Sequence, residues 1–262
     1  RKVNLKTRRQ IVEKGEVLLE VNNLSILSEN KEPLLSNLDV KLHKNEILGI
    51  AGVQGNGQTE FIEALTGLRK ISSGKISYFG KECKNFSPRK IHQLGVRHIP
   101  EDRQKQGLIG DFSLTENIIL NTYYEKKFSN NIALNWSNAK KEAKRIIEKF
   151  DVRTNSEEII ADKLSGGNQQ KLLIGREMSR SINLLIASQP TRGVDVGSIE
   201  YIHNQIVMAR NKGIGVLLNS TELDEIIALS DRIIVFYEGT VIAEFPSNAD
   251  PNIIGLAMAG VN

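Results

Sequence analysis

The sequence predicts an α/β fold built around a largely parallel sheet. In the C-terminal half of the chain, short apolar segments typical of buried strands alternate with helical segments, which is the pattern of βαβ units. A glycine-rich turn also joins an apolar strand to a helix near residue 52. Further strand-like segments near the N-terminus predict an antiparallel β subdomain, and a polar middle region predicts a helical subdomain.

The composition is that of an ordinary globular protein. The 262 residues are 40% hydrophobic and 25% charged, and 35 Lys and Arg against 31 Asp and Glu leave a net charge of +4. This small excess does not indicate a nucleic-acid partner. The single cysteine, Cys83, excludes an internal disulfide and a cysteine-rich zinc site. No segment has the roughly 18–20 consecutive apolar residues of a membrane-spanning helix, so we expect any membrane role to depend on partners.

The first elements follow a short basic segment. Residues 1–16 contain little that could pack, so we expect a linker there and one domain over 17–262. The apolar run 47–53 predicts a buried strand that enters the glycine-rich turn. The elements expected in this half are strand-like segments at 17–26, 35–53, 74–80 and 95–100 and a helix at 59–68.

The middle of the chain predicts a helical subdomain over about 113–165. Segments 113–124 and 138–150 are amphipathic, with expected N-terminal caps at Ser113 and Ser137. Helices and strands then alternate again, as a parallel sheet requires. They are helices at 171–180, 198–213 and 222–230 and strands at 183–187, 215–220 and 232–239.

The turn after the strand at 47–53 has the spacing of a phosphate-binding loop. Its sequence GVQGNGQT matches G-x-x-x-x-G-K-[ST], except that Gln58 replaces the lysine. Backbone N–H groups of such a loop can wrap a phosphate, and the next helix adds its positive N-terminus. Close packing is the alternative role of a glycine turn. The candidate nucleotide-binding residues are Gly52, Gln54, Gly55, Asn56, Gly57, Gln58, Thr59 and Glu60, with Thr59 also a candidate metal ligand.

The missing lysine weakens this loop. An ammonium at position 58 would form charge-assisted hydrogen bonds worth about 1.5–3 kcal/mol each. Gln58 can donate only a neutral bond in return.

A second motif, LSGGNQQK at 164–171, precedes an apolar strand that ends in SQPTRGVD. In this order and spacing, the motifs resemble those of the nucleotide-binding domains of ATP-binding cassette (ABC) transporters, over roughly residues 17–260. The resemblance implies a P-loop NTPase fold with a RecA-like parallel sheet core, an antiparallel β subdomain and a helical signature subdomain. It assigns the signature to Leu164, Ser165, Gly166, Gly167, Asn168 and Gln169, and the Asp loop to Asp195.

The resemblance implies that this signature acts on another domain. In the family, two such domains pair head to tail, and each signature contacts the ATP on the other domain's phosphate loop. The Ser165 hydroxyl, the N–H groups of Gly166 and Gly167, and a helix expected to begin near Asn168 suit a γ-phosphate presented from outside.

The residues that the resemblance links to hydrolysis are replaced. Ser188 and Gln189 stand where the family has the magnesium-linked Asp and the catalytic Glu, and Thr221 stands at the switch histidine. Glu101, in the segment IPEDR, takes a nucleotide-contact position that is usually Gln. Losing a general base alone costs about 10²–10⁴ in rate. We therefore expect no hydrolysis by the isolated domain, and weak or no binding of ATP and Mg²⁺ at its own site.

In combination, the motifs resemble the second cassette of the tandem ATP-binding proteins of carbohydrate and nucleoside importers. This implies an N-terminal cassette on the same polypeptide, two membrane permease subunits, a substrate-binding lipoprotein that acts indirectly, and a position on the cytoplasmic face of the membrane. The NGQ loop, SQPTRG and FDVRT resemble the nucleoside branch. A ribose or galactose importer is the alternative.

Two other hypotheses remain. A pseudo-ATPase that holds a cassette dimer together and binds no nucleotide is compatible with Gln58. A soluble cassette acting on ribosomes or DNA would usually need two competent phosphate loops, so we expect no nucleic-acid partner.

The region 101–120 contains three apolar residues that predict either a docking groove for a permease or core packing. They are Phe112, Leu114 and Ile118.

Overall fold

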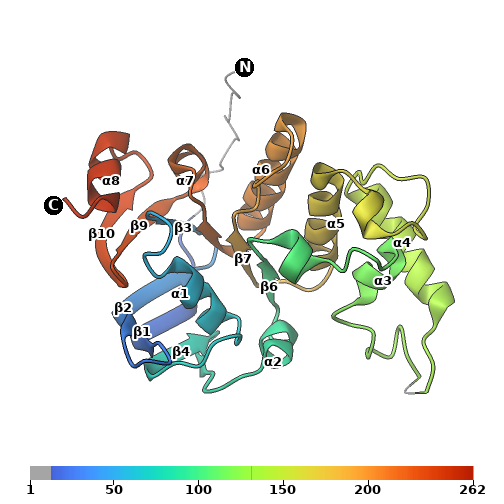
Figure 1. The fold of residues 1–262 in the computed structure, drawn as a ribbon, viewed down its shortest axis with the longest axis horizontal. Coiled ribbons are helices and arrows are strands. Elements are labelled where there is room, and N and C mark those ends of the chain that lie inside the picture. Colours follow the sequence, from blue (N-terminus) through green and yellow to red (C-terminus); the bar gives the residue numbers. More distant parts are fainter. Residues whose placement is uncertain (1–12, 131, 262) are drawn as a thin grey trace. The chain divides into compact units, whose positions relative to one another are not determined.

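The computed structural model describes residues 13–130 and 132–261 (Figure 1). These residues fall into two units. The first unit contains the N-terminal part of the chain as far as His98, together with Ile182–Gln189 and everything from His203 onward. The second contains Ile99–Ser181 and Pro190–Ile202. Residues 1–12 of the expected linker lie outside the described residues.

The first unit is organised around a six-stranded sheet with the order β10-β9-β3-β8-β7-β6. The pairs β3–β8, β3–β9 and β7–β8 are parallel, and β10 is antiparallel to β9. Every residue of β3, β7 and β8 is buried, as expected for strands covered on both faces. The bounds are β3 (Ile47–Ala51), β6 (Val96–Ile99), β7 (Leu184–Ser188), β8 (Gly215–Asn219), β9 (Arg232–Tyr237) and β10 (Thr240–Pro246). The predicted parallel core is confirmed.

A second, antiparallel sheet with the order β2-β1-β4-β5 confirms the predicted β subdomain. Its inward-facing side chains share one core with the first sheet and with α1, where the rings of Phe61 and Phe236 lie 5.4 Å apart. The strands are β1 (Val17–Leu27), β2 (Pro33–His43), β4 (Ser73–Tyr78) and β5 (Lys81–Glu82). The helices of this unit are α1 (Gln58–Leu65), α2 (Pro88–Gln93), α7 (Leu223–Leu229), α8 (Pro251–Met258) and the C-terminal part of α6 (Val196–Asn211).

The second unit is helical, and it includes the segment 113–165 and extends beyond it on both sides. Besides the start of α6, it contains α3 (Leu114–Ile119), α4 (Trp136–Lys149), α5 (Gly166–Met178), the π-helical turn η1 (Arg103–Gly107) and the 3₁₀ turn η2 (Ala161–Lys163). Helix α4 packs against α3 and α5.

Two helix starts differ from expectation. The cap of α4 is Asn135, whose side chain accepts from the Asn138 N–H, so the prediction of Ser137 was wrong. Helix α5 begins at Gly166, two residues before Asn168. None of the helices in the described part of the chain is long and apolar enough to cross a membrane.

Candidate functional site

The phosphate loop lies in the first unit, between the end of β3 and the start of α1. It therefore follows the carboxyl end of a central parallel strand, where ligands bind in open α/β sheets. Gly57 has a φ of 103°, and a Cβ at this position would collide with the Leu35 side chain. Only glycine meets both requirements, so close packing accounts for Gly57. The role of the turn in phosphate binding stays a prediction.

Gln58 turns inward within this loop. Its side chain is only 6% exposed, and Nε2 donates to the Val53 carbonyl at 3.2 Å. The same carbonyl accepts from the Asn56 N–H at 3.3 Å and from its Nδ2 at 3.1 Å. A Cβ at Gly52 would collide with the Gln58 amide. The side chain at the lysine position thus stabilises the loop internally and adds no positive charge.

The ends of β7 and β8 are tied together by neutral groups. The Gln189 Oε1 accepts from both the N–H and the hydroxyl of Thr221, each at 3.2 Å. The Gln189 N–H donates to the Asn219 carbonyl at 2.7 Å. The buried hydroxyl of Ser188 has no hydrogen-bond partner among the described residues. Because an amide and hydroxyls do not take up a proton near pH 7, Ser188, Gln189 and Thr221 offer no general base.

The candidate magnesium ligands at this site are hydroxyls and include no carboxylate. Mg²⁺ in nucleotide sites is held by carboxylates together with substrate phosphates, whereas the chain offers the hydroxyls of Thr59 and Ser188. Across residues 13–130 and 132–261, no group of three or more His, Cys, Asp or Glu side chains could hold a metal ion. That the backbone N–H groups of the loop hold a phosphate stays a prediction.

Glu101 lies in the second unit, two residues after the end of β6. Its Oε1 is 2.5 Å from Nη1 of Arg192. Asp102 caps the following turn and accepts from the N–H groups of Gln104 and Lys105, each at 3.0 Å. These backbone bonds, chiefly the one from Lys105, hold the pKa of Asp102 below its usual value.

The signature forms the N-terminus of α5. Ser165 is exposed and caps the helix, because its hydroxyl accepts from Nδ2 of Asn168 at 2.9 Å and from the Asn168 N–H at 3.4 Å. Leu164, Gly167 and Gln169 are buried. The first turn of this helix therefore presents the Ser165 side chain outward, and the N–H groups of a first helical turn have no partner within the helix.

Asp195 caps α6 in the same unit. Its carboxylate accepts from the hydroxyl of Ser198 at 2.7 Å and from the Ser198 N–H at 3.0 Å. These two bonds lower the pKa of Asp195. A Cβ at Gly167 would lie 2.5 Å from the Asp195 Oδ2, so the absence of a side chain at Gly167 lets the signature and the Asp loop pack directly together.

The sequence left open whether three apolar residues pack in the core or form a docking groove. Leu114 and Ile118 are fully buried, whereas Phe112 is 38% exposed. Core packing therefore accounts for the first two residues. Two residues missed by the sequence reasoning are Arg103 and Arg192, which stand inside motifs already singled out and hold the surrounding loops together.

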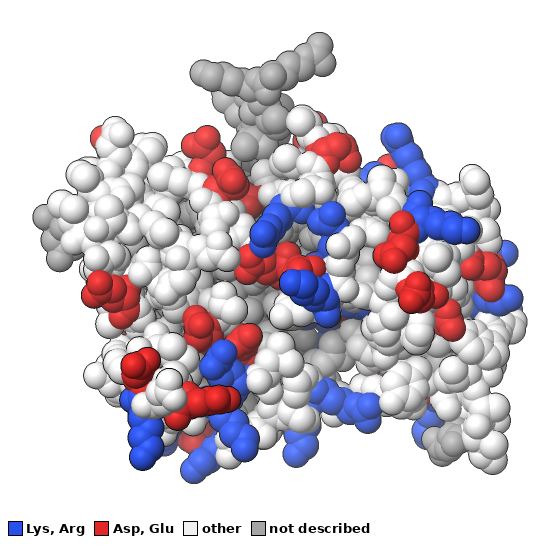
Figure 2. Space-filling model, viewed as in Figure 1, with Lys and Arg blue, Asp and Glu red and all other residues white. Residues whose placement is uncertain are grey.

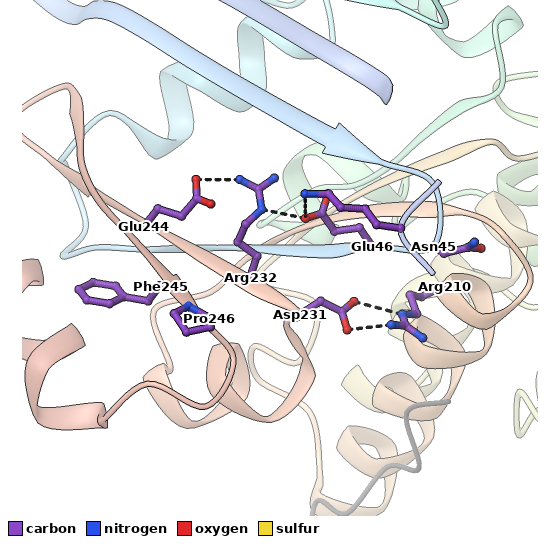
Figure 3. A pocket seen from close by; sticks show the side chains of 9 residues that line it. Asn45, Glu46, Arg210, Asp231, Arg232, Glu244, Phe245 and Pro246 are labelled. Atoms are coloured by element: carbon purple, nitrogen blue, oxygen red, sulfur yellow. Dashed lines mark hydrogen bonds and ion pairs between the residues drawn. The ribbon is translucent and has the colours of Figure 1, made fainter. Parts of the chain in front are cut away.

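The first unit also contains a charged pocket of about 420 Å³. Figure 3 shows Arg232 reaching between Glu46 and Glu244, and Asp231 facing Arg210. The pocket lies beside the amino ends of β3 and β9. The phosphate loop follows the opposite end of β3, so the pocket is not part of the candidate nucleotide site.

Comparison with known proteins agrees with this geometry. The family model described as ABC transporter matches residues 35–192. The guanosine import ATP-binding protein NupO of Bacillus subtilis is 46% identical over 261 residues, covering 99% of this chain and 51% of that protein. The glucose import ATP-binding protein TsgD13 of Haloferax volcanii is 43% identical over 263 residues, covering 99% of this chain and 48% of that protein.

A solved structure supports the fold. The crystal structure of a nucleotide-free ATP-binding cassette from an ABC transporter matches with a TM-score of 0.75 and 22% sequence identity. The match covers 92% of this chain and 95% of that chain. The fold is accordingly the α/β P-loop NTPase fold of such cassettes. The present chain spans about half the length of the curated relatives that it matches.

Proposed function

This chain belongs to the ABC transporter family, and we propose that it is the signature-donating cassette of an ATP-driven nucleoside importer. In this proposal its own ATP site is degenerate, and LSGGNQQ completes the ATP site of a partner cassette. The partner, an N-terminal cassette of the same polypeptide, supplies the phosphate lysine, the metal carboxylate and the general base. The pair works with two membrane permease subunits at the cytoplasmic face and, indirectly, with a substrate-binding lipoprotein.

The contrast between the two halves of the site carries this proposal. Ser165 is exposed at the start of a regular helix, with its backbone donors available to an external phosphate. At the chain's own loop, Gln58 is bonded to Val53, and Gln189 is bonded to Thr221. A domain that exposes a signature serine and has no charged catalytic groups at its own loop fits a role in assisting hydrolysis elsewhere.

The proposed substrate is a nucleoside. The guanosine import relative has a higher identity than the glucose import relative, 46% against 43%, and a ribose or galactose-type sugar is the alternative. Uptake of radiolabelled guanosine and of glucose or ribose by the reconstituted transporter separates the two. Competition of guanosine uptake by other nucleosides, but not by sugars, is expected.

The surface charge is in keeping with a protein partner. Figure 2 shows acidic side chains interspersed among the basic ones over the visible face. Binding to a nucleic-acid backbone relies instead on clustered Lys and Arg. We propose no nucleic-acid partner.

Ser165→Ala in the complete two-cassette transporter tests the donated signature. We expect ATP hydrolysis and transport to fall at least about tenfold, because a contact to the γ-phosphate is lost. Asn135→Ala is the control, since it also removes a helix cap in the second unit but leaves the signature unchanged, and it should keep activity within about twofold. Wild-type hydrolysis by Ser165→Ala contradicts the proposal.

Calorimetry with ATP, with and without Mg²⁺, tests the degenerate site. Together with a phosphate-release assay on this chain, it should give measurable ATP binding, little dependence on Mg²⁺ and no turnover. Absence of binding would favour a pseudo-ATPase that donates its signature without holding nucleotide. Steady hydrolysis would mean that the roles assigned to Gln58, Ser188, Gln189 and Thr221 are wrong.

A further inference from the structure

The Arg103 guanidinium connects three segments of the second unit. Its Nη1 donates to the Arg192 carbonyl at 2.8 Å, and its Nη2 donates to the Gly193 carbonyl at 3.3 Å. The Nε donates to Oε1 of Gln169, also at 3.3 Å. One planar group thus joins the turn η1, the segment that follows β7, and the first turns of α5. Only arginine presents several donors in such a fixed fork.

The partners of Arg103 belong to the two loops that face another cassette in the proposed function. Gln169 is buried in the first turns of α5, where its Nε2 also donates to the Ala161 carbonyl at 3.1 Å. Arg192 and Gly193 lead directly into Asp195, the cap of α6. Arg103 therefore acts on both loops at once without belonging to either.

The packing around this side chain is close. A Cβ at Gly166 would lie 2.6 Å from the Arg103 Nη2 and 2.9 Å from the Gly193 carbonyl oxygen. The signature backbone, the guanidinium and the segment after β7 thus touch directly.

An ion pair strengthens the same connection. Glu101, two residues before Arg103, binds the Arg192 side chain at 2.5 Å, while Arg103 binds the Arg192 carbonyl. Asp102, which lies between Glu101 and Arg103, caps the turn η1 by accepting from the Gln104 N–H. The segment 101–103 therefore binds both the side chain and the backbone carbonyl of Arg192.

We propose that Arg103 is a positioning residue for ATP hydrolysis at the partner cassette. It fixes the spacing between the signature at Ser165 and the Asp loop at Asp195, so that both loops reach the partner's nucleotide together. This inference rests on the proposed function, in which the signature is donated. The inference is that the donated signature also depends on Arg103, a residue that lies outside both the signature and the Asp loop.

Arg103→Lys in the complete transporter tests the inference. Lysine keeps the charge but cannot span three acceptors with a planar fork. We expect kcat for ATP hydrolysis to fall about tenfold, with KM for ATP within about twofold, because the loss concerns an interaction realised during turnover. Arg145→Lys is the control, since Arg145 makes a fork to Glu142 on α4 of the same unit, and its kcat should stay within about twofold.

A double variant separates an effect of Arg103 through the signature from an independent loss of activity. If Arg103 acts through the signature, Arg103→Lys should reduce the residual rate of Ser165→Ala by less than about twofold. A full additional tenfold loss overturns the inference. Where Arg103→Lys does not fold, Arg103→Ala measured with and without guanidinium ion replaces it, and restoration of kcat by the added ion is expected. A folded Arg103→Ala whose rate is not restored contradicts the inference.

The two proposals fail in distinguishable ways. Wild-type activity of Ser165→Ala would contradict the proposed function, in which the signature is donated to a partner. Reduced activity of Ser165→Ala with wild-type kcat for Arg103→Lys overturns only the role of Arg103. Equal losses in Arg103→Lys and Arg145→Lys, with equally lowered thermal midpoints, also overturn it, because Arg103 would then contribute stability alone.

Discussion

In the proposed function, Gln58, Ser188 and Gln189 each replace a different contribution to ATP hydrolysis. Gln58 provides no positive charge beside the phosphates, Ser188 provides no carboxylate for the metal, and Gln189 provides no general base. Gln58 and Gln189 are buried, and their side chains are bonded to Val53 and Thr221 respectively. Since the losses concern separate parts of the machinery, restoring one of them should leave the others limiting.

Gln58→Lys should therefore not restore activity. We expect phosphate release by this chain to remain at background, while ATP affinity rises about tenfold from the added charge–phosphate interaction. Calorimetry and a phosphate-release assay measure the two quantities. Gln58→Ala, which adds no charge, should bind no more tightly than the wild type. Sustained turnover by Gln58→Lys would show that Ser188 and Gln189 do not limit hydrolysis.

At the scale of an element, the start of α3 shows what a local motif can fix. Ser113 accepts from the Glu116 N–H at 3.1 Å, and the Glu116 carboxylate accepts from the Ser113 N–H at 2.7 Å. This reciprocal capping box is encoded within four consecutive residues. The start of α4 is different, because Asn135 and Ser137 are both good caps. Asn135 was selected by a loop contact, in which its N–H donates to the Phe128 carbonyl at 2.7 Å.

Ser113→Ala should lower the free energy of unfolding by about 1 kcal/mol and the thermal midpoint by about 2–4 °C. The reason is that the N–H of Glu116 loses its acceptor. Thermal denaturation followed by circular dichroism provides the measurement. Ser137→Ala is the matched control and should change stability by less than about 0.5 kcal/mol, since Ser137 lies inside α4. Equal effects of the two substitutions would contradict the assignment of the caps.

At the scale of the whole molecule, the charged pocket of Figure 3 joins residues far apart in the sequence. Glu46 binds Arg232 at 2.8 Å across 186 positions, and its side chain is 4% exposed. Arg232 in turn binds Glu244 at 2.9 Å. Burial opposes ionisation of Glu46, but the hydrogen bond and charge of Arg232 outweigh it, so the pKa of Glu46 lies below its usual value of 4.5.

Glu46→Gln should destabilise the protein in a pH-dependent way. A lowered folded-state pKa gives stability that is present above the unfolded-state pKa and is lost as the pH falls through the folded-state pKa. We expect a loss of about 2–3 kcal/mol at pH 7. The difference from wild type should shrink below about pH 4.5. Urea denaturation at a series of pH values measures it.

Glu20→Gln is the control for this experiment. Glu20 pairs with Lys41 at 2.8 Å, but both side chains are well exposed. An exposed pair contributes at most about 1 kcal/mol, so the control should show a much smaller loss at pH 7. A pH-independent loss in Glu46→Gln would mean that packing, and not ionisation, accounts for the stability.

The sequence by itself determined the parallel sheet, the antiparallel subdomain and the locations of the main motifs. These follow from local patterns: buried apolar strands between amphipathic helices, a glycine turn of fixed spacing, and LSGGNQQ before the strand at 184–188. Each is written in consecutive residues, so no knowledge of distant contacts is needed.

Only the tertiary structure decided which side chains meet across the fold. Gln189 accepts from Thr221, 32 positions away, and Arg103 donates to Gln169 and to the carbonyl of Arg192, 66 and 89 positions away. Such contacts depend on which elements the topology brings together and on how their side chains fill the space between them. Periodicity and motif spacing describe single elements, so they do not predict these side-chain contacts between elements.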